Sequence, residues 1–449
     1  MTGSFPGVAI SPPPPVSGNP LKRVAFELRA ERRSGGLPPG DTLPSLSRTR
    51  AMIRNPLGLL LDAYQRHGPV FSLRVLHANN VFVLGPEANH FMLVSGARNF
   101  TWRDGGFGDL IPLLGDGLLT VDGDWHRRDR RAILPAFHSE RIAGYRATME
   151  QEALRGLESW RDGEVVDLYH WAREVALRVA MRALFGFEGD AGEPARQFER
   201  ALAYYGEDYW LQVLRGPRTP YARLVDARGR LDALVYAEIE RRRASGERGE
   251  DVLSLLLDSE LDDRHVRDEV MTLLFAGHDT TTATVSFLFW ELAERPDYDD
   301  LDSALDETLR LYPPAWIGPR RSVAEFDLHG HRIPAGVPVN YSSWASHRLP
   351  DVWEDPHAFR PERFLPGERE KIPRGAYVPF GGGSRICLGM RFGQMEIKVI
   401  AVAIRERFRL ERMPGFALEI RQTPTLGPRD GLPMRIRAHH GGRPGLGAS

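Results

Sequence analysis

Hydrophobic positions recur at helical spacing along most of the chain, and the longest such pattern covers residues 263–294. A helix of roughly 32 residues would be about 48 Å long, enough to cross a whole domain. Residues 141–248 show the same periodicity in several amphipathic segments, which are broken at 186–193 and 216–220. The pattern therefore predicts a largely helical protein with one long central helix.

Shorter elements are predicted on both sides of this region. Asn55 followed by Pro56 is typical of a helix start. The other predicted elements are helices over 55–66 and 390–408, a strand pair at 70–75 and 81–84, and strands within 417–436. Few strands beside many helices indicate a mainly α fold with small β-sheets (α+β).

The length of 449 residues would by itself suggest about three domains. No convincing linker, however, interrupts residues 21–438. Residues 1–20 are rich in proline and glycine, which is typical of a disordered lead. The glycine-rich tail, residues 439–449, is expected to be flexible.

Composition narrows the class of protein. Hydrophobic residues make up 42% and charged residues 27%, which is normal for a globular protein with a sizeable core. A net charge of −1 argues against a nucleic-acid partner. One cysteine cannot form an internal disulfide and suits a reducing cytosol. We find no signal-peptide pattern and no run near the ~20 apolar residues of a membrane span, so we expect a cytoplasmic protein.

The single cysteine, Cys387, lies in a glycine-rich loop before the helix that begins at Met390. Three consecutive glycines, residues 381–383, let the chain turn tightly beside a flat ligand. A helix N-terminus favours a thiolate. A cysteine thiolate can be a ligand of haem iron, where it pushes electron density onto the iron and favours O–O cleavage. A buried structural cysteine or a phosphate-binding loop are the alternatives. The loop lacks the Gly-Lys-Ser/Thr ending of a P-loop.

A second unusual stretch, Ala-Gly-His-Asp-Thr-Thr at residues 276–281, lies near the middle of the long helix. A glycine inside a helix costs roughly 1 kcal/mol, and such local exceptions tend to mark functional sites. Thr280 lies four residues after Ala276, so its hydroxyl can bond the Ala276 carbonyl and loosen the helix. A buried helix with packed threonines is the alternative, and His278 could be considered as a metal ligand.

The loop reads Phe-x-x-Gly-x-Arg-x-Cys-x-Gly from Phe380 to Gly389, and residues 276–281 read Ala-Gly-x-Asp-Thr-Thr. In both motifs the chain resembles the cytochrome P-450 superfamily, in its soluble bacterial type. The resemblance covers about residues 55–437 and implies a single domain, 21–438, with a long central helix over the haem. It implies a monooxygenase that inserts one atom of O2 into a lipophilic small molecule such as a terpenoid, fatty acid or polyketide.

The resemblance also implies roles for particular residues. Cys387 would be the axial ligand of the iron in haem b, and Asp279 and Thr280 would deliver protons while dioxygen is reduced. The haem propionates would be held by His126, Arg130, Arg320 and Arg385. Further haem contacts are implied for Phe380, Gly381, Ala276 and Gly389. Trp125 is one residue out of register with the pair formed by His126 and Arg130.

Substrate and electron donor are less determined. The residues implied to face substrate are Phe107, Leu110, Ile111, Phe275, Trp316, Ile317 and Leu426, and a core loop is the alternative for the first three. No flavin or iron–sulfur segment is fused to the sequence, so we expect electrons from a ferredoxin and its reductase. The basic residues Arg127, Arg128 and Arg131 could receive such an acidic donor.

Glu307 and Arg310 are implied by the resemblance to bond Arg363 and to lock the fold on the proximal side of the haem. The family usually has a further helix between the long helix and this glutamate. Here only residues 297–303 remain for it.

Two other functions stay open. One is a haem-thiolate enzyme that uses peroxide or rearranges its substrate without a reductase, and the other is a non-enzymatic haem sensor. The Asp279–Thr280 pair argues against the first, and a sensor would have little need for such a proton relay.

Overall fold

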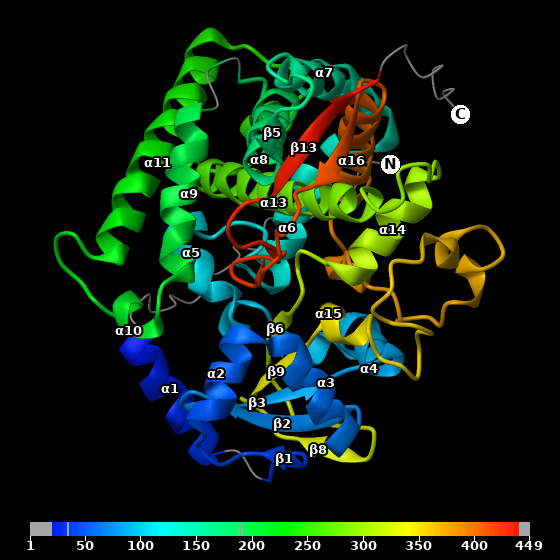
Figure 1. Ribbon diagram of the computed structural model, residues 1–449. Helices are drawn as coiled ribbons and strands as arrows, with labels where there is room; N and C mark the ends of the chain where they lie inside the picture. The colour runs from blue at the N-terminus through cyan, green and yellow to red at the C-terminus, as the bar shows by residue number, and fades with distance from the viewer. Residues whose placement is uncertain (1–19, 34–35, 188, 190–191, 440–449) are drawn as a thin grey trace, which may run out of the picture.

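The computed structural model describes residues 20–33, 36–187, 189 and 192–439. The predicted lead and tail lie outside these residues, apart from Pro20 and His439. Helices dominate the described chain and small sheets accompany them (Figure 1). The predicted mainly α fold with small β-sheets is therefore confirmed.

The α-helices follow the sequence periodicity. They are α1 (Pro20–Arg33), α2 (Leu46–Arg54), α3 (Pro56–His67), α4 (Pro86–His90), α5 (Ile111–Leu114), α6 (Gly123–Ile133), α7 (Ser139–Leu157), α8 (Leu168–Val179), α9 (Gly192–Gly206), α10 (Tyr209–Gln212), α11 (Pro220–Ser245), α12 (Val252–Leu257), α13 (Asp263–Leu292), α14 (Leu301–Leu311), α15 (Ser343–Ser346) and α16 (Met390–Arg405). Asn55 caps α3 as predicted, because its side chain accepts a hydrogen bond from the Gly58 N–H at 3.0 Å.

The strands are β1 (Gly40–Asp41), β2 (Val70–Val75), β3 (Ala78–Val83), β4 (Phe100–Thr101), β5 (Val165–Asp167), β6 (Gly318–Ser322), β7 (Phe326–Leu328), β8 (His331–Ile333), β9 (Pro338–Tyr341), β10 (Phe408–Arg412), β11 (Ile420–Arg421), β12 (Gly427–Pro428) and β13 (Pro433–Ala438). The largest sheet has the order β1-β2-β3-β9-β6-β4, and β10-β13-β5 form a second. The predicted strand pair is confirmed, with Val70 opposite Val83. The helix predicted over 390–408 ends earlier, at Arg405. Strand β10 already begins at Phe408, which pairs with Ala438 of β13.

Helix α13 runs across the middle of the molecule, and the six-stranded sheet lies with α1, α2 and α3 at one end (Figure 1). Helix α13 packs against α8, α14 and α16. Val285 and Leu288 belong to the largest apolar cluster, whereas Phe287 belongs to the cluster that reaches the sheet through Phe71 and Phe82. The long helix thus joins the two main parts of the core, and burying each such side chain contributes about 1.5–3 kcal/mol.

The chain passes from α13 to α14 through residues 293–300, which contain no helix. This turn is closed by its own contacts. Asp300 accepts the Ser303 N–H at 2.9 Å, and the Tyr298 hydroxyl lies 2.6 Å from the Ser303 hydroxyl. The further helix that the resemblance implied is therefore absent from this described segment, and α14 follows α13 directly.

Behind this turn, Glu307 and Arg310 form a fully buried ion pair on α14, with 2.7 Å between Arg310 Nε and Glu307 Oε2. Arg363 approaches the same carboxylate, with its Nε 3.5 Å from Glu307 Oε1. Arg310 also donates to the carbonyl oxygens of His347 and Pro356, both at 2.8 Å. The implied ion-pair lock is thus present, and it holds the segment that leads to the Cys387 loop.

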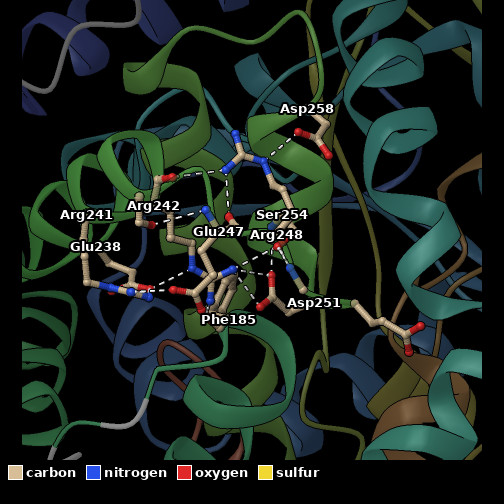
Figure 2. A network of polar contacts seen from close by, with 12 residues as sticks. Phe185, Glu238, Arg241, Arg242, Glu247, Arg248, Asp251, Ser254 and Asp258 are labelled. Atoms are coloured by element: carbon tan, nitrogen blue, oxygen red, sulfur yellow. Dashed lines mark hydrogen bonds and ion pairs between the residues drawn. The ribbon is translucent and has the colours of Figure 1, made fainter.

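A second buried arginine fastens the C-terminal part of α11 to α12 (Figure 2). The Arg242 side chain is only 2% exposed, and it pairs with Glu238 and Asp251, both at 2.8 Å. It also donates to Ser254 Oγ at 2.9 Å and to the Phe185 carbonyl at 2.6 Å. Every side-chain nitrogen of Arg242 therefore has an acceptor.

Replacing Arg242 with methionine is expected to lower the free energy of unfolding by about 3–5 kcal/mol, because the largely buried Asp251 carboxylate loses its cation and Glu238 keeps only the exposed Arg241. Urea unfolding measures this loss. The neighbouring Arg241, whose side chain is 49% exposed, provides the control, since Arg241→Met should leave the midpoint nearly unchanged. Equal midpoints for the two variants would contradict a special role of Arg242.

Candidate functional site

The loop before α16 presents Cys387. Gly381 and Gly383 adopt positive φ angles of 69° and 61°, and a Cβ on Gly383 would lie 2.2 Å from the Leu93 carbonyl oxygen. The Cys387 N–H donates to the Phe380 carbonyl at 2.9 Å, which closes the loop. As a result Cys387 is exposed just before the N-terminus of α16.

The electrostatics at Cys387 differ from the prediction. Cys387 is accessible within a pocket but has protein atoms around it, and the resulting loss of hydration raises the pKa of its thiol. The Gly389 backbone N–H and the Arg130 guanidinium act in the opposite direction but do not outweigh this rise. The helix N-terminus therefore does not by itself produce a thiolate. A metal cation bound to the sulfur is needed to keep the thiol deprotonated.

On α13, the predicted motif forms an accessible strip on a buried helix. Of residues 271–289, all of them described, only Ala276, Gly277 and Thr280 are not buried. The Thr280 hydroxyl donates to the Ala276 carbonyl at 2.7 Å, as predicted. The helix nevertheless stays continuous through this point.

The strip is tied to the helix that follows the Cys387 loop. Thr281 donates from its hydroxyl to Glu396 Oε2 at 3.0 Å, and Glu396 lies on α16. The strip and the loop therefore belong to one region of the molecule.

Four basic side chains predicted to hold propionates also come together. Arg320 and Arg385 both lie over the ring of Trp102, with their guanidinium carbons 3.6 and 4.7 Å from its centroid. Arg130 and Arg385 are near enough to His126 to affect its protonation. Sequence reasoning missed Trp102, because nothing in its local pattern distinguishes it from a core aromatic residue.

These groups crowd positive charge into a partly buried space. Burial, with the charges of Arg385 and Arg130, lowers the pKa of His126 to about 3. Burial lowers the pKa of Arg320 to about 10, and burial together with Arg320 and Arg130 lowers that of Arg385 to about 10. Asp122, 2.7 Å from Arg385, offsets only part of this charge. Such a cluster fits the two carboxylates of a haem, beside a cysteine and an open strip of helix.

Asp279 is fully buried and faces two arginines from distant parts of the chain. Its Oδ1 lies 3.3 Å from Arg173 on α8 and 3.4 Å from Arg421 on β11, and Thr425 donates to its Oδ2. Burial alone would raise the pKa of Asp279, but Arg421 and Arg173 outweigh it and the pKa is lowered. Asp279 is therefore an ionised carboxylate in a dry interior.

Two neighbours of the motifs are turned away from the site. His278 is buried, its Nδ1 lies 2.8 Å from the Leu274 carbonyl and its ring packs on Phe198. This contact with its own helix gives no support to His278 as a metal ligand. Trp125 stacks on His265 with ring centroids 4.6 Å apart, away from His126.

Glu396 is a functional candidate that sequence reasoning missed. Its side chain is 1% exposed and no cation offsets its charge, so burial raises its pKa to about 8. The signal that could have found it is an acid on the apolar face of the helix that follows Cys387. At neutral pH it is a protonated carboxyl next to Thr281.

Glu396 should make stability depend on pH. Its folded pKa, about 8, lies above the ordinary value of 4.5, so the folded state holds a proton that the unfolded chain releases. This contribution is fully present below pH 4.5 and falls by about 1.4 kcal/mol per pH unit until about pH 8. Glu396→Gln should remove this slope, which urea unfolding at pH 6, 7 and 8 would detect. A constant difference between the two proteins across this range would refute it.

Six of the seven residues predicted to face substrate fall into two groups. Phe107 stacks on Trp102 at 4.6 Å, and Leu110 and Ile111 follow it, half-buried. Trp316, Ile317 and Leu426 meet in the apolar cluster beside the sheet, where Trp316 Nε1 donates to the Gln422 carbonyl at 2.7 Å. Phe275, by contrast, is buried in the largest cluster.

None of the described helices is both long and apolar enough to cross a membrane.

Around Cys387, a pocket of about 450 Å³ opens between the loop and α6, lined by residues that include Arg130, Leu388 and Arg391.

Comparison with known proteins gives consistent matches. The cytochrome P450 family model matches residues 45–300 and 301–428, two segments that meet at the turn between α13 and α14. The chain is 34% identical to cyclooctat-9-en-7-ol 5-monooxygenase of Streptomyces melanosporofaciens, over 421 residues that cover 85% of this chain and 91% of that protein. It is 32% identical to cyclooctatin synthase of the same organism, with 88% and 93% covered. The solved structure of retinoic acid bound cyanobacterial CYP120A1 matches with a TM-score of 0.80 at 29% identity, covering 90% and 99% of the two chains.

Proposed function

Because the chain belongs to the cytochrome P450 family of haem-dependent monooxygenases, we propose that Cys387 is the axial thiolate of its haem and that its substrate is a terpenoid. The names of two relatives, which refer to cyclooctat-9-en-7-ol and to cyclooctatin, support this substrate class. The observation that carries the proposal is the exposed Cys387 in a loop closed onto the Phe380 carbonyl.

When bound, the haem supplies an iron with a thiolate ligand, which activates dioxygen. The chain would hold it through Arg130, Arg320 and Arg385, whose positive charge suits two propionates, and through His126, whose neutral imidazole can still donate a hydrogen bond. Phe380, Gly381 and Gly389 shape the loop beside Cys387, and the small, exposed Ala276 would leave room for the haem along the α13 strip. Asp279 and Thr280 supply protons.

The proton route follows from the contacts of these two residues. Asp279 is kept ionised by Arg173 and Arg421, so it can accept a proton but holds it weakly. Thr280 donates to the Ala276 carbonyl at rest, and its oxygen lone pairs remain available to accept a proton. Asp279 and Thr280 are consecutive on α13, which supports a proton path from the carboxylate to the open strip.

The electron donors are a ferredoxin and its reductase. Arg127 and Arg131 are exposed on α6, the helix whose Arg130 lines the pocket that contains Cys387 and Arg391. Arg128 is held by Asp129 and His265 and is less available than the sequence suggested. An exposed basic face suits an acidic electron-transfer protein.

Substrate class is tested by titrating the haem-loaded protein with terpenoid alcohols, fatty acids and polyketides and following the Soret band. We expect a saturable blue shift, from loss of a sixth ligand, with the terpenoids at the lowest concentration. Products are then sought with ferredoxin, reductase and NADPH, or with peroxide alone. Turnover with peroxide only would replace the proposed donors, and tighter binding of fatty acids would replace the terpenoid.

Thr280→Ala should separate electron consumption from product formation, because the open strip loses its hydroxyl. We expect a several-fold increase in hydrogen peroxide released per NADPH consumed. Thr282→Ala is the matched control, since Thr282 makes the same type of bond, to the His278 carbonyl at 2.6 Å, from the buried side of α13. Equal peroxide release from both variants would count against the role of Thr280.

A further inference from the structure

A cluster of Asp129, His265 and Glu269 lies apart from the residues assigned to the reaction. His265 and Glu269 are four residues apart on α13, and Asp129 comes from α6. Their ligand atoms all lie within 4.8 Å of one another, with His265 Nε2 3.7 Å from Asp129 Oδ2. One imidazole and two carboxylates from two helices thus converge on one point.

The two carboxylates lack donors at that point. Asp129 and Glu269 are both fully buried, and Asp129 Oδ2 and Glu269 Oε1 accept no hydrogen bond from the described residues. Their other oxygens are satisfied, by Arg128 Nε at 2.8 Å and by the Leu118 N–H at 3.1 Å. A buried carboxylate oxygen without a donor carries a large desolvation penalty, so two of them side by side require a proton or a cation between them.

We propose that Asp129, His265 and Glu269 bind one divalent cation of the Zn²⁺ type. Zn²⁺ takes imidazole nitrogen and carboxylate oxygen together, and sites of three protein ligands are common for it. Mg²⁺ and Ca²⁺ prefer oxygen ligands alone, so they suit this set less well. Trp125, stacked on His265, fixes the plane of the imidazole.

Arg128 controls access to this site. Its Nη2 lies 3.1 Å from His265 Nε2, so it occupies one of the ligand atoms, and its guanidinium also pairs with Asp129 through Oδ1, the oxygen beside the one offered to the metal. The Arg128 side chain is 31% exposed, which leaves it room to swing into solvent. The guanidinium therefore competes with the metal, and its removal should strengthen binding.

The site would clamp α6 to α13. Asp129 is adjacent to Arg130 and three residues after His126. A bound ion would therefore hold in place the helix that carries two of the basic residues placed at the haem. It is separate from the iron, and its loading can be measured on its own.

The test is a calorimetric Zn²⁺ titration of chelator-washed, haem-loaded protein, in which the iron occupies the only cysteine. We expect one high-affinity Zn²⁺ per chain, binding at least roughly tenfold weaker in Glu269→Gln, and tighter binding in Arg128→Ala. Glu260→Gln, an exposed glutamate before α13, should leave the affinity unchanged. Mg²⁺ is the control ion.

If Glu269→Gln does not fold, His265→Asn at a less buried position serves instead, and its thermal midpoint should no longer rise with Zn²⁺. Absence of a 1:1 site, equal affinity in the variants, or weaker binding in Arg128→Ala would each overturn the proposal. The first result would identify the cluster as a carboxyl–carboxylate pair that shares a proton and is held by Arg128.

Discussion

Replacing Cys387 with serine is expected to abolish the red-shifted Soret band of the reduced, carbon-monoxide-bound protein and to lower turnover at least about 10³-fold. A serine hydroxyl stays protonated at neutral pH, so it cannot supply the thiolate that the iron requires. Because Cys387 is the single cysteine of the chain, no other thiol can take its place. The measurement is the reduced carbon-monoxide spectrum of both proteins.

The control for this variant is haem content and helicity. The four basic side chains proposed to hold the propionates do not depend on the sulfur, so we expect Cys387→Ser to keep its fold and much of its haem. A red-shifted band that persisted in this cysteine-free chain would remove Cys387 from the site. Thiol labelling gives a second readout, since haem should protect the wild-type sulfur that is exposed in the apoprotein.

Asp279→Asn is expected to lower turnover by about 10²-fold or more, because the amide cannot accept and release a proton. The variant should also be less stable by about 3–5 kcal/mol, since Arg173 and Arg421 lose the carboxylate between them. Turnover is measured at saturating donor, in H2O and in D2O. A larger solvent isotope effect in the variant is expected if proton delivery has become slow.

Arg421→Gln separates the two effects. It removes one of the cations at Asp279 but keeps the carboxylate, so the pKa of Asp279 should rise while proton transfer continues. We expect this variant to retain turnover within about tenfold of wild type. If Arg421→Gln lost as much turnover as Asp279→Asn, the network would be structural and Asp279 would have no separate role in proton transfer.

Local patterns predicted those features whose partners lie close together in the sequence. The sequence predicts the cap at Asn55, the strand pair that begins at Val70 and the bond from Thr280 to Ala276, because each depends on at most a few neighbouring residues. The Cys387 loop was recognised from fixed positions within ten residues.

What could not be predicted comes from distant segments. Arg173 and Arg421 lie 106 and 142 residues from Asp279 in sequence, and neither occupies a position with a distinctive local pattern. The pairing of β3 with β9, and the place of Trp102 between two arginines, likewise depend on tertiary packing. The raised pKa of the Cys387 thiol likewise depends on tertiary structure. The dipole at the helix N-terminus is a local feature, whereas the loss of hydration at the sulfur comes from the folded chain around it.

The short turn between α13 and α14 has a mechanical consequence. With only residues 293–300 between them, and with Asp299 bonded to Arg405 on α16, the two helices have little slack. A displacement of α13 by one helical turn, about 5.4 Å, would pull directly on Glu307 and its ion pairs. A longer connection would absorb such a movement. In this chain α13 and α14 have to move together, so opening of the helix at Thr280 must be confined to local bending.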